Sequence, residues 1–374
     1  MATRYWVGGE TNSATNPWNA TATANWSTTS GGAGGASAPT IADDVVFDAN
    51  SAVWTSITTY YNVIVATGAV CKNFSAVGSG IEGPRFKPDA ASSILEINGS
   101  MAVPLNRDSV YWAKDTGKLL TIKFSSTTTG NTISVSADTT TCGCTFDGVG
   151  GEWTLLSRFV VNSGEAVTLT NGVLKLNALN LTAGYFYSSN SNVRTLNFGG
   201  IGTSGITLYG SSGTVFDCTN STNLTVVTAI QRYIYLIGTG TKTFAGGGKT
   251  WGTVTLEGNT VTVTGSNTFQ GVFNAITATP MTLLFTAGTT QTFLSTVNLS
   301  GAASNLLTIN STVSGTQATL SKAAVSTVTA NYVNIKDSNA TGGAAWLAYN
   351  ATNSGNNTGW AFPGAVGSSM MMFC

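Results

Sequence analysis

The residues of this chain that could do chemistry are its carboxylates, because it has no histidine among 374 residues. The lack of histidine excludes Ser-His-Asp and Cys-His nucleophiles, histidine-ligated zinc and histidine bases. Glycoside hydrolysis, in contrast, needs only two carboxyl groups about 5–9.5 Å apart across the scissile bond. The candidates are Asp108 with Asp115, and Asp138, Asp147 and Glu152 around the segment CGC at 142–144.

Each of these acids also has a local context that explains it without catalysis. Asp115 lies between Lys114 and Lys118, and Asp147 precedes Gly148, as a turn residue would. We therefore predict no enzymatic activity and no cofactor, with polysaccharide cleavage kept as the alternative.

A metal site is not expected either. Asp43, Asp44 and Asp48 lie close together, but calcium takes six or more oxygen ligands, and three acids around a strand-like VVF do not reach that number. We predict turn and capping roles for them. The five cysteines include no CxxC pair, and we expect them to be reduced and mostly buried small hydrophobes: Cys71, Cys142, Cys144, Cys218 and Cys374.

Two tyrosine clusters could bind sugars by stacking. They are AGYFYSS, with Tyr185 and Tyr187, and QRYIYLIG, with Tyr233 and Tyr235. Strand alternation places Tyr233 and Tyr235 on one face, with Ile234 and Leu236 on the other. Packing or an interface is the alternative role for both clusters.

The two ends of the chain carry further candidate contact residues. Trp6, Trp18 and Trp26 cluster before a Gly/Ser/Ala loop, STTSGGAGGASAP, and the segment DDVVFDANS follows it. We interpret this region as a small cap or attachment module in which the aromatics supply a local core. The tail contains Met370, Met371 and Met372, which suit burial against another subunit or protein. The candidate interface or glycan contacts are therefore Trp6, Trp18, Trp26, Tyr185, Tyr187, Tyr233, Tyr235, Met370, Met371 and Met372.

The composition restricts the possible partners. Charged residues are 9% of the chain, against roughly 25% in an average domain, and 16 basic residues balance 16 acidic ones. No basic patch suits nucleic acid, and no apolar run reaches the ~20 residues of a membrane-spanning helix. From residue 259 onward only Lys322, Lys336 and Asp337 are charged, which favours a homo-oligomer that covers its sides.

The elements that must position these residues are short strands. Runs such as LTIKFSS and VTLEGNTVTVTG alternate with period two between Gly, Asn and Ser. The pair TF recurs at Phe244, Phe269 and Phe293, at intervals of 25 and 24 residues. Such a period predicts a right-handed parallel β-helix in which these three phenylalanines stack inside and the preceding threonines form an outer ladder. An ordinary β-sandwich or barrel is the alternative.

We expect three parts: a cap or attachment module at 1–55, the solenoid at 56–331, and a terminal coil, cap and Met-rich tail at 332–374. The terminal coil has a pattern of its own, DSNATGGA, then a tryptophan, then NTGW. It is carried by Asp337, Ser338, Asn339, Ala340, Thr341, Gly342, Gly343, Trp346, Asn357, Thr358, Gly359, Trp360 and Phe362.

This terminal pattern resembles the last coil of β-helix surface proteins of bacteriophage virions and of adhesin-like bacterial proteins. The opening RYWVGG with its tryptophans and DDVVFDA is similar to the N-terminal module of such phage proteins, and residues 285–330 are similar to their preceding coils. The resemblance covers about a third of the chain, mostly its ends, and leaves 75–235 without a counterpart.

The resemblance implies a non-enzymatic structural protein of a phage virion, exposed as a capsid decoration, head fibre or tail fibre. It also implies a homotrimer that contacts capsid or tail proteins and is assembled in the host cytoplasm, which fits the lack of a signal-peptide pattern at MATRYWVGGE. The alternative is a receptor-binding tailspike that recognises, or cleaves, host surface polysaccharide.

Overall fold

The computed structural model describes residues 2–8, 17–51, 62–77, 84–103, 111–112, 117–136, 140–199, 204–276, 279–323 and 325–363. They contain strands, turns and bends and no helix. The chain divides into two compact units. Unit 1 is Met1–Ile201 with Thr222–Val227, and unit 2 is Gly202–Ser221 with Thr228–Cys374.

Unit 1 is built from parallel ladders, rows of strands paired side by side. The β1 ladder contains β1 (Thr3–Trp6), β4 (Asp44–Asp48), β7 (Phe74–Val77), β10 (Met101–Val103), β13 (Asn131–Val135), β15 (Gly143–Leu155), β17 (Ala166–Lys175), β20 (Arg194–Asn197) and β23 (Leu224–Val227). The β6 ladder contains β6 (Ala69–Cys71), β9 (Ser92–Ile97), β12 (Leu119–Phe124), the first halves of β15 and β17, and β19 (Tyr185–Tyr187).

Two shorter ladders complete unit 1. One contains β2 (Pro17–Trp18), β5 (Asn62–Val65), β8 (Arg85–Pro88) and β11 (Tyr111–Trp112). The other contains β14 (Thr140–Thr141), β16 (Phe159–Val161) and β18 (Leu181–Ala183). Among the described strand pairs only β1 with β3 (Trp26–Ser27) is antiparallel, at the start of the chain.

Unit 2 repeats this plan. The β21 ladder contains β21 (Gly205–Leu208), β24 (Tyr233–Leu236), β27 (Thr253–Glu257), β30 (Phe273–Ile276) and β33 (Val297–Asn298). The β22 ladder contains β22 (Ser212–Asp217), β25 (Thr241–Ala245), β28 (Thr260–Thr264), β31 (Met281–Phe285), β34 (Leu307–Ser311), β37 (Val333–Ile335) and β40 (Thr352–Asn353).

A third ladder of unit 2, the β26 ladder, contains β26 (Thr250–Trp251), β29 (Thr268–Phe269), β32 (Thr290–Phe293), β35 (Ala318–Lys322) and β38 (Ser338–Thr341). A final parallel group contains β36 (Thr327–Asn331), β39 (Ala345–Tyr349) and β41 (Trp360–Ala361).

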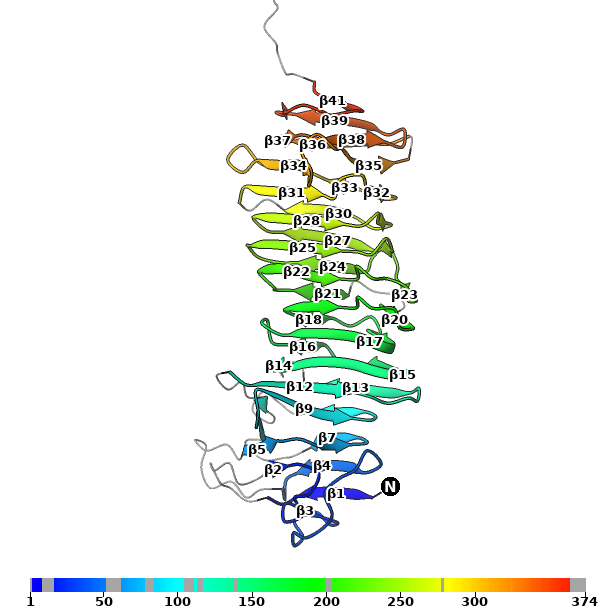
Figure 1. Ribbon diagram of the computed structural model, residues 1–374. Helices are drawn as coiled ribbons and strands as arrows, with labels where there is room; N and C mark the ends of the chain where they lie inside the picture. The colour runs from blue at the N-terminus through cyan, green and yellow to red at the C-terminus, as the bar shows by residue number, and fades with distance from the viewer. Residues whose placement is uncertain are drawn as a thin grey trace, which may run out of the picture. The chain divides into compact units, whose positions relative to one another are not determined.

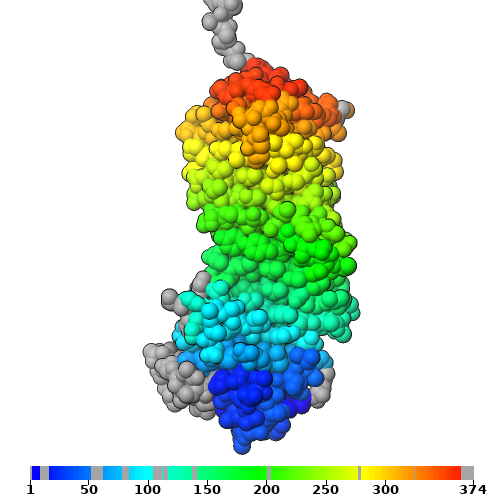
Figure 2. Space-filling model, viewed as in Figure 1, coloured from blue at the N-terminus to red at the C-terminus, as the bar shows by residue number. Residues whose placement is uncertain are grey.

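The order of strands in unit 2 explains the ladders. From β24 to β38 the chain forms five successive groups of three strands, the first β24–β25–β26 and the last β36–β37–β38. Figure 1 shows these groups stacked one after another. In Figure 2 the colour of unit 2 changes in bands toward red, so each coil covers the one before it. This arrangement confirms the predicted all-β fold with parallel strands and is consistent with a β-helix or solenoid.

Alternation of side chains fills the interior. In β28, Val261 and Val263 are fully buried while Thr260, Thr262 and Thr264 face outward, half-buried. Parallel pairing then places like residues above one another, and Thr241, Thr260 and Thr282 stand in one register column. The interior is therefore apolar, and the outer face is rich in hydroxyl groups.

The predicted stack of three phenylalanines is correct for two of them. Phe269 and Phe293 are register partners with stacked rings 5.6 Å apart. Phe244 lies in a different ladder, where its register partners are Phe216 and Val263, so it does not share the register of Phe269. Its ring is nevertheless buried and lies 6.2 Å from the ring of Phe269, so the predicted contact is present without the predicted alignment. The residue paired with Phe269 on the other side is Trp251.

The corners explain this correction, because the coils differ in length. Register partners are separated by only 14 residues at Trp346 and Trp360 but by 32 at Met101 and Ile133. Tight corners also select for glycine: a Cβ on Gly240, which has a φ of +106°, would lie 1.9 Å from the carbonyl oxygen of Ser211. The predicted boundaries at 55 and 331 stay a prediction.

Candidate functional site

The tyrosines of β24 lie on the outer face of unit 2, as alternation predicts. Tyr233 and Tyr235 are half-buried, whereas Ile234 and Leu236 are buried in the interior. The register partners of Tyr235 are Thr207 and Thr255, so the ring stands between threonines of the adjacent strands.

Glu257, at the end of β27, connects this tyrosine to the next coil. The Tyr235 hydroxyl donates a hydrogen bond to Glu257 Oε1, and the Gly238 N–H donates to Glu257 Oε2 over 2.7 Å. Partial burial raises the pKa of Tyr235, and the hydrogen bond and negative charge of Glu257 raise it further. The neutral Tyr235 hydroxyl is thus a donor held by the Glu257 carboxylate.

Lys242 lies near the same corner, and its positive charge interacts with the negative charge of Glu257. Its side chain is buried, and Nζ donates to the carbonyl oxygens of Ile237 and Gly238 over 2.5 and 2.6 Å. Burial lowers the pKa of this amine, while the charge of Glu257 opposes that shift. Tyr209 is an accessible ring, 46% exposed, whose phenolate charge also raises the pKa of Tyr235.

The second tyrosine cluster lies in unit 1. Tyr185 and Tyr187 project from the outer face of β19, half-buried, with ring centroids 5.9 Å apart and nearly parallel, and Phe186 between them is buried in the interior. Both predicted tyrosine pairs are therefore on outer faces, one pair in each unit.

The tryptophans of the N-terminal region form a core. Trp6, Trp18 and Trp26 have no exposed area and pack against one another and against Phe47, with the Trp6 and Trp26 rings 5.0 Å apart. The expected local core is thus present. Their suggested role as interface or glycan contacts is corrected, because rings buried on every side offer no contact surface. Met370, Met371 and Met372 lie outside the described residues.

Two of the candidate carboxylates, Asp147 and Glu152, are described, and each is paired with a lysine. Asp147 lies 3.3 Å from Lys123 Nζ, and Glu152 lies 2.7 Å from Lys175 Nζ. Asp147 also accepts a hydrogen bond from Asn171 Nδ2. The two acids are therefore each engaged with neighbouring coils. Asp108, Asp115 and Asp138 lie outside the described residues.

The acids considered for calcium hold turns together, as expected. Asp43 accepts hydrogen bonds from the Ala2 and Thr40 N–H groups and from the Thr40 hydroxyl. Asp48 accepts from the Asn50 N–H, and Asp44 accepts from Asn73 Nδ2. In the described part of the chain no group of three or more His, Cys, Asp or Glu residues could hold a metal.

Four cysteines are described, and all are free thiols. Cys71, Cys144 and Cys218 are buried and Cys142 is half-buried. Burial raises the pKa of the Cys71 thiol well above its usual value, which keeps that sulfur neutral and unreactive. The expectation of mostly buried small hydrophobes is confirmed for these four residues.

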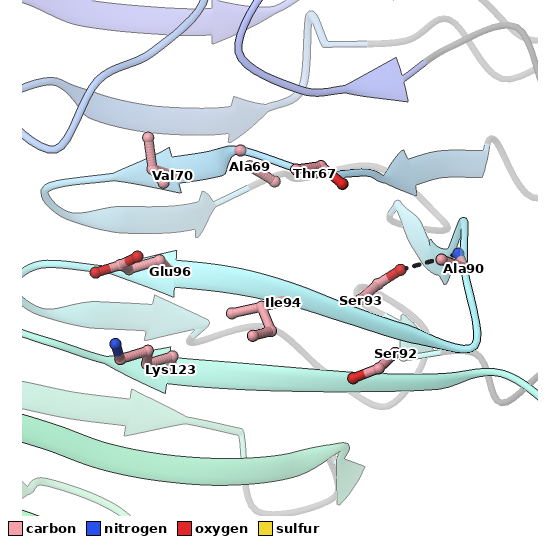
Figure 3. Close-up of a pocket in the computed structure, with 10 residues that line it drawn as sticks. Thr67, Ala69, Val70, Ala90, Ser92, Ser93, Ile94, Glu96 and Lys123 are labelled. Atoms are coloured by element: carbon pink, nitrogen blue, oxygen red, sulfur yellow. Dashed lines mark hydrogen bonds between the residues drawn. The ribbon is translucent and has the colours of Figure 1, made fainter.

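A pocket of about 290 Å³ opens on the outer face of the β6 ladder in unit 1. Figure 3 shows Thr67, Ala69 and Val70 on the β6 side facing Ile94 and Glu96 of β9. Sequence reasoning missed this pocket and also the Tyr235–Glu257 pair. Both depend on the register between coils, which has no local signal in the sequence.

Comparisons with known proteins identify no relative. No family model, curated protein or solved structure matches the chain. Among the described residues there is also no helix with the length and hydropathy to cross a membrane.

Proposed function

We propose that this chain is a right-handed parallel β-helix that serves as a non-enzymatic structural protein of a phage virion, exposed as a capsid decoration, head fibre or tail fibre. The observation that supports the structural role best is the repeated passage of the chain through three parallel ladders. Such a stack buries its backbone groups in strand pairing and presents a regular, largely uncharged face. The virion assignment rests on the resemblance of the two ends of the chain to phage surface proteins.

The outer face of unit 2 supports assembly with identical copies. The β22 ladder carries Ser212, Thr241, Thr260, Thr282 and Thr308 in one register column, without a charge. In unit 1, by contrast, ion pairs such as Lys123–Asp147 cross between adjacent strands of the β6 ladder. An uncharged sheet face can be covered without desolvating charges, which favours a homotrimer.

The ion pairs of Asp147 and Glu152 favour a non-enzymatic role, because a general acid in glycoside hydrolysis must be free to donate its proton. Incubation with bacterial capsular polysaccharide tests this point. We expect unchanged polymer length with wild-type protein and with the Asp138→Asn and Glu152→Gln variants alike. Shortening that either variant abolishes would establish the cleaving alternative.

A receptor-binding tailspike is the second candidate, and the corner of Tyr235 favours it. The exposed ring of Tyr209, the Tyr235 hydroxyl and the carboxylate of Glu257 combine a stacking surface with polar groups, as sugar sites do. Binding to host cells that falls with Tyr209→Ala would support this role.

Two measurements test the structural proposal. Mass spectrometry of purified virions should detect the chain in constant ratio to the capsid protein, and light scattering of the purified protein should give three times its 38.4 kDa mass. Absence from washed particles would contradict the virion role, and a monomer at micromolar concentration would contradict the trimer.

A further inference from the structure

The pocket on the β6 ladder exists because the pairing of β6 with β9 is incomplete. Their register begins at Ala69 with Leu95 and continues to Cys71 with Ile97. The preceding residues of β9, 92–94, pair with β12 on one side and have no register partner on β6. The turn at Thr67 and Gly68 lies opposite these residues of β9. A pocket therefore forms in the place where further pairing of β6 with β9 would bring the two strands together.

The turn that bounds the pocket is fixed by its glycine. Gly68 has a φ of +84°, and a Cβ there would lie 2.9 Å from the Cβ of Ala20. The Ala69 N–H donates to the Ala66 carbonyl, which closes the turn. The opposite wall is held by Ser93, whose hydroxyl accepts from the Asp89 and Ala90 N–H groups (Figure 3). The pocket is therefore preformed.

Its lining is amphipathic. Ala69, Val70 and Ile94 supply apolar surface, and Ile94 is 47% exposed. Thr67 and Ser92 add side-chain hydroxyl groups at the rim. The volume of about 290 Å³ is at the small end of ligand pockets, which suits one ring-sized group.

The pocket contains two charged side chains, Glu96 and Lys123, and among the described residues only Lys123 is in an ion pair. Glu96 and Lys123 are register partners on β9 and β12. Lys123 is paired with Asp147 on the next coil. Glu96 lies half-buried between Val70 and Lys123, and within the described part of the chain its carboxylate has neither a hydrogen bond nor an ion pair. A carboxylate in this position is an acceptor available to a ligand.

We infer that this pocket binds a single sugar residue, with the Glu96 carboxylate accepting from two adjacent hydroxyl groups and the apolar wall of Ile94 and Val70 packing against the C–H face of the ring. The chemistry favours a neutral polyol over a cation, because the nearby Lys123 amine repels cations and one carboxylate gives too few oxygens for a metal ion. The inference goes beyond the proposed virion role and does not depend on it. Purified protein suffices to test it.

The test is ligand-observed saturation-transfer NMR with the methyl glycosides of glucose, galactose and N-acetylglucosamine. We expect at least one to bind with a Kd on the order of 1 mM, as a single small ring allows. Glu96→Gln should weaken that binding about tenfold or more, because a charge-assisted hydrogen bond is lost. Val70→Phe, which fills the pocket without changing charge, should abolish it.

Asp217→Asn is the matched control, since it also removes one carboxylate but lies at the end of β22 in unit 2, outside both candidate sugar sites. We expect it to leave the affinity unchanged. The inference is overturned if no glycoside binds, or if Glu96→Gln binds the sugars with wild-type affinity. It is also overturned if the pocket binds a cation, N-acetyl-lysine methylamide, saturably in place of the sugars. Loss of binding only in Glu257→Gln would overturn it in favour of the tyrosine corner.

Discussion

The Tyr235 hydroxyl on β24 donates a hydrogen bond to the carboxylate of Glu257 on β27, one coil further along the chain. The same carboxylate accepts the Gly238 N–H, so one acid fixes both an outward ring and the turn that follows it. The pair shows how neighbouring coils of this fold place side chains 22 residues apart in direct contact.

Removing the charge of Glu257 should therefore change how Tyr235 titrates. In the folded protein burial and Glu257 raise the pKa of this phenol. The unfolded phenol ionises near pH 10, so its contribution to stability is complete below about pH 10 and is lost as the pH rises through the folded value. Glu257→Gln should lower the folded pKa, as ultraviolet titration of tyrosinate would show.

Tyr235→Phe is the control for that titration, because it removes the phenol altogether. The wild type should have one more late-titrating tyrosine than Tyr235→Phe, and Glu257→Gln should shift that same tyrosine to lower pH. Identical titration curves for wild type and Glu257→Gln would contradict the hydrogen bond.

The stacked rings of Phe269 and Phe293 should contribute strongly to the stability of unit 2. Phe269→Ala removes a fully buried ring and should destabilise the protein by about 3–5 kcal/mol. The outward Thr268→Ala next to it should change stability by less than about 0.5 kcal/mol. Denaturant unfolding measures both, and equal effects would contradict the assigned faces of β29.

Tryptophan-to-phenylalanine changes should distinguish two kinds of buried indole in unit 1. Trp26 and Trp153 are both fully buried, but Trp153 Nε1 donates to the Gly99 carbonyl, whereas within the described chain Trp26 Nε1 has no partner. Trp153→Phe therefore loses a hydrogen bond, and Trp26→Phe removes an unsatisfied donor. We expect Trp153→Phe to lower the free energy of unfolding by about 1 kcal/mol more than Trp26→Phe does.

Thermal or denaturant unfolding of these two variants gives the comparison. The reverse order, with Trp26→Phe the more damaging, would show that its N–H makes a contact that matters for stability.

Asp337 should make the terminal coils sensitive to acid. Its side chain has no exposed area and accepts hydrogen bonds from Asn356 Nδ2 at 2.6 Å and the Gly315 N–H at 3.1 Å. The hydrogen bond from Asn356 is the main reason that its pKa is lowered. Stability from this group is present above the unfolded pKa of about 3.9 and is lost as the pH falls through the folded value.

We therefore expect the melting temperature of the wild type to fall more between pH 5 and pH 2 than that of Asp337→Asn, for which the group does not titrate. Parallel curves for the two proteins over that range would contradict this role.

The sequence predicts the local rules of this fold better than its long-range register. Alternation correctly places Ile234 and Leu236 inside and Tyr233 and Tyr235 outside, because it depends only on neighbouring residues. Phe244 contacts Phe269 but does not align with it, because the length of each corner sets which residues become register partners, and corner lengths vary with glycine and loop content. The Glu96 pocket was beyond prediction for the same reason.

The location of this chain on a phage particle is the most direct test of the structural proposal. Cryo-electron microscopy of virions that carry the chain should show three-fold density on the exterior of the capsid or along a fibre, into which the stacked ladders of unit 2 fit. Density confined to the interior of the particle, or no density for the chain at all, would contradict the account.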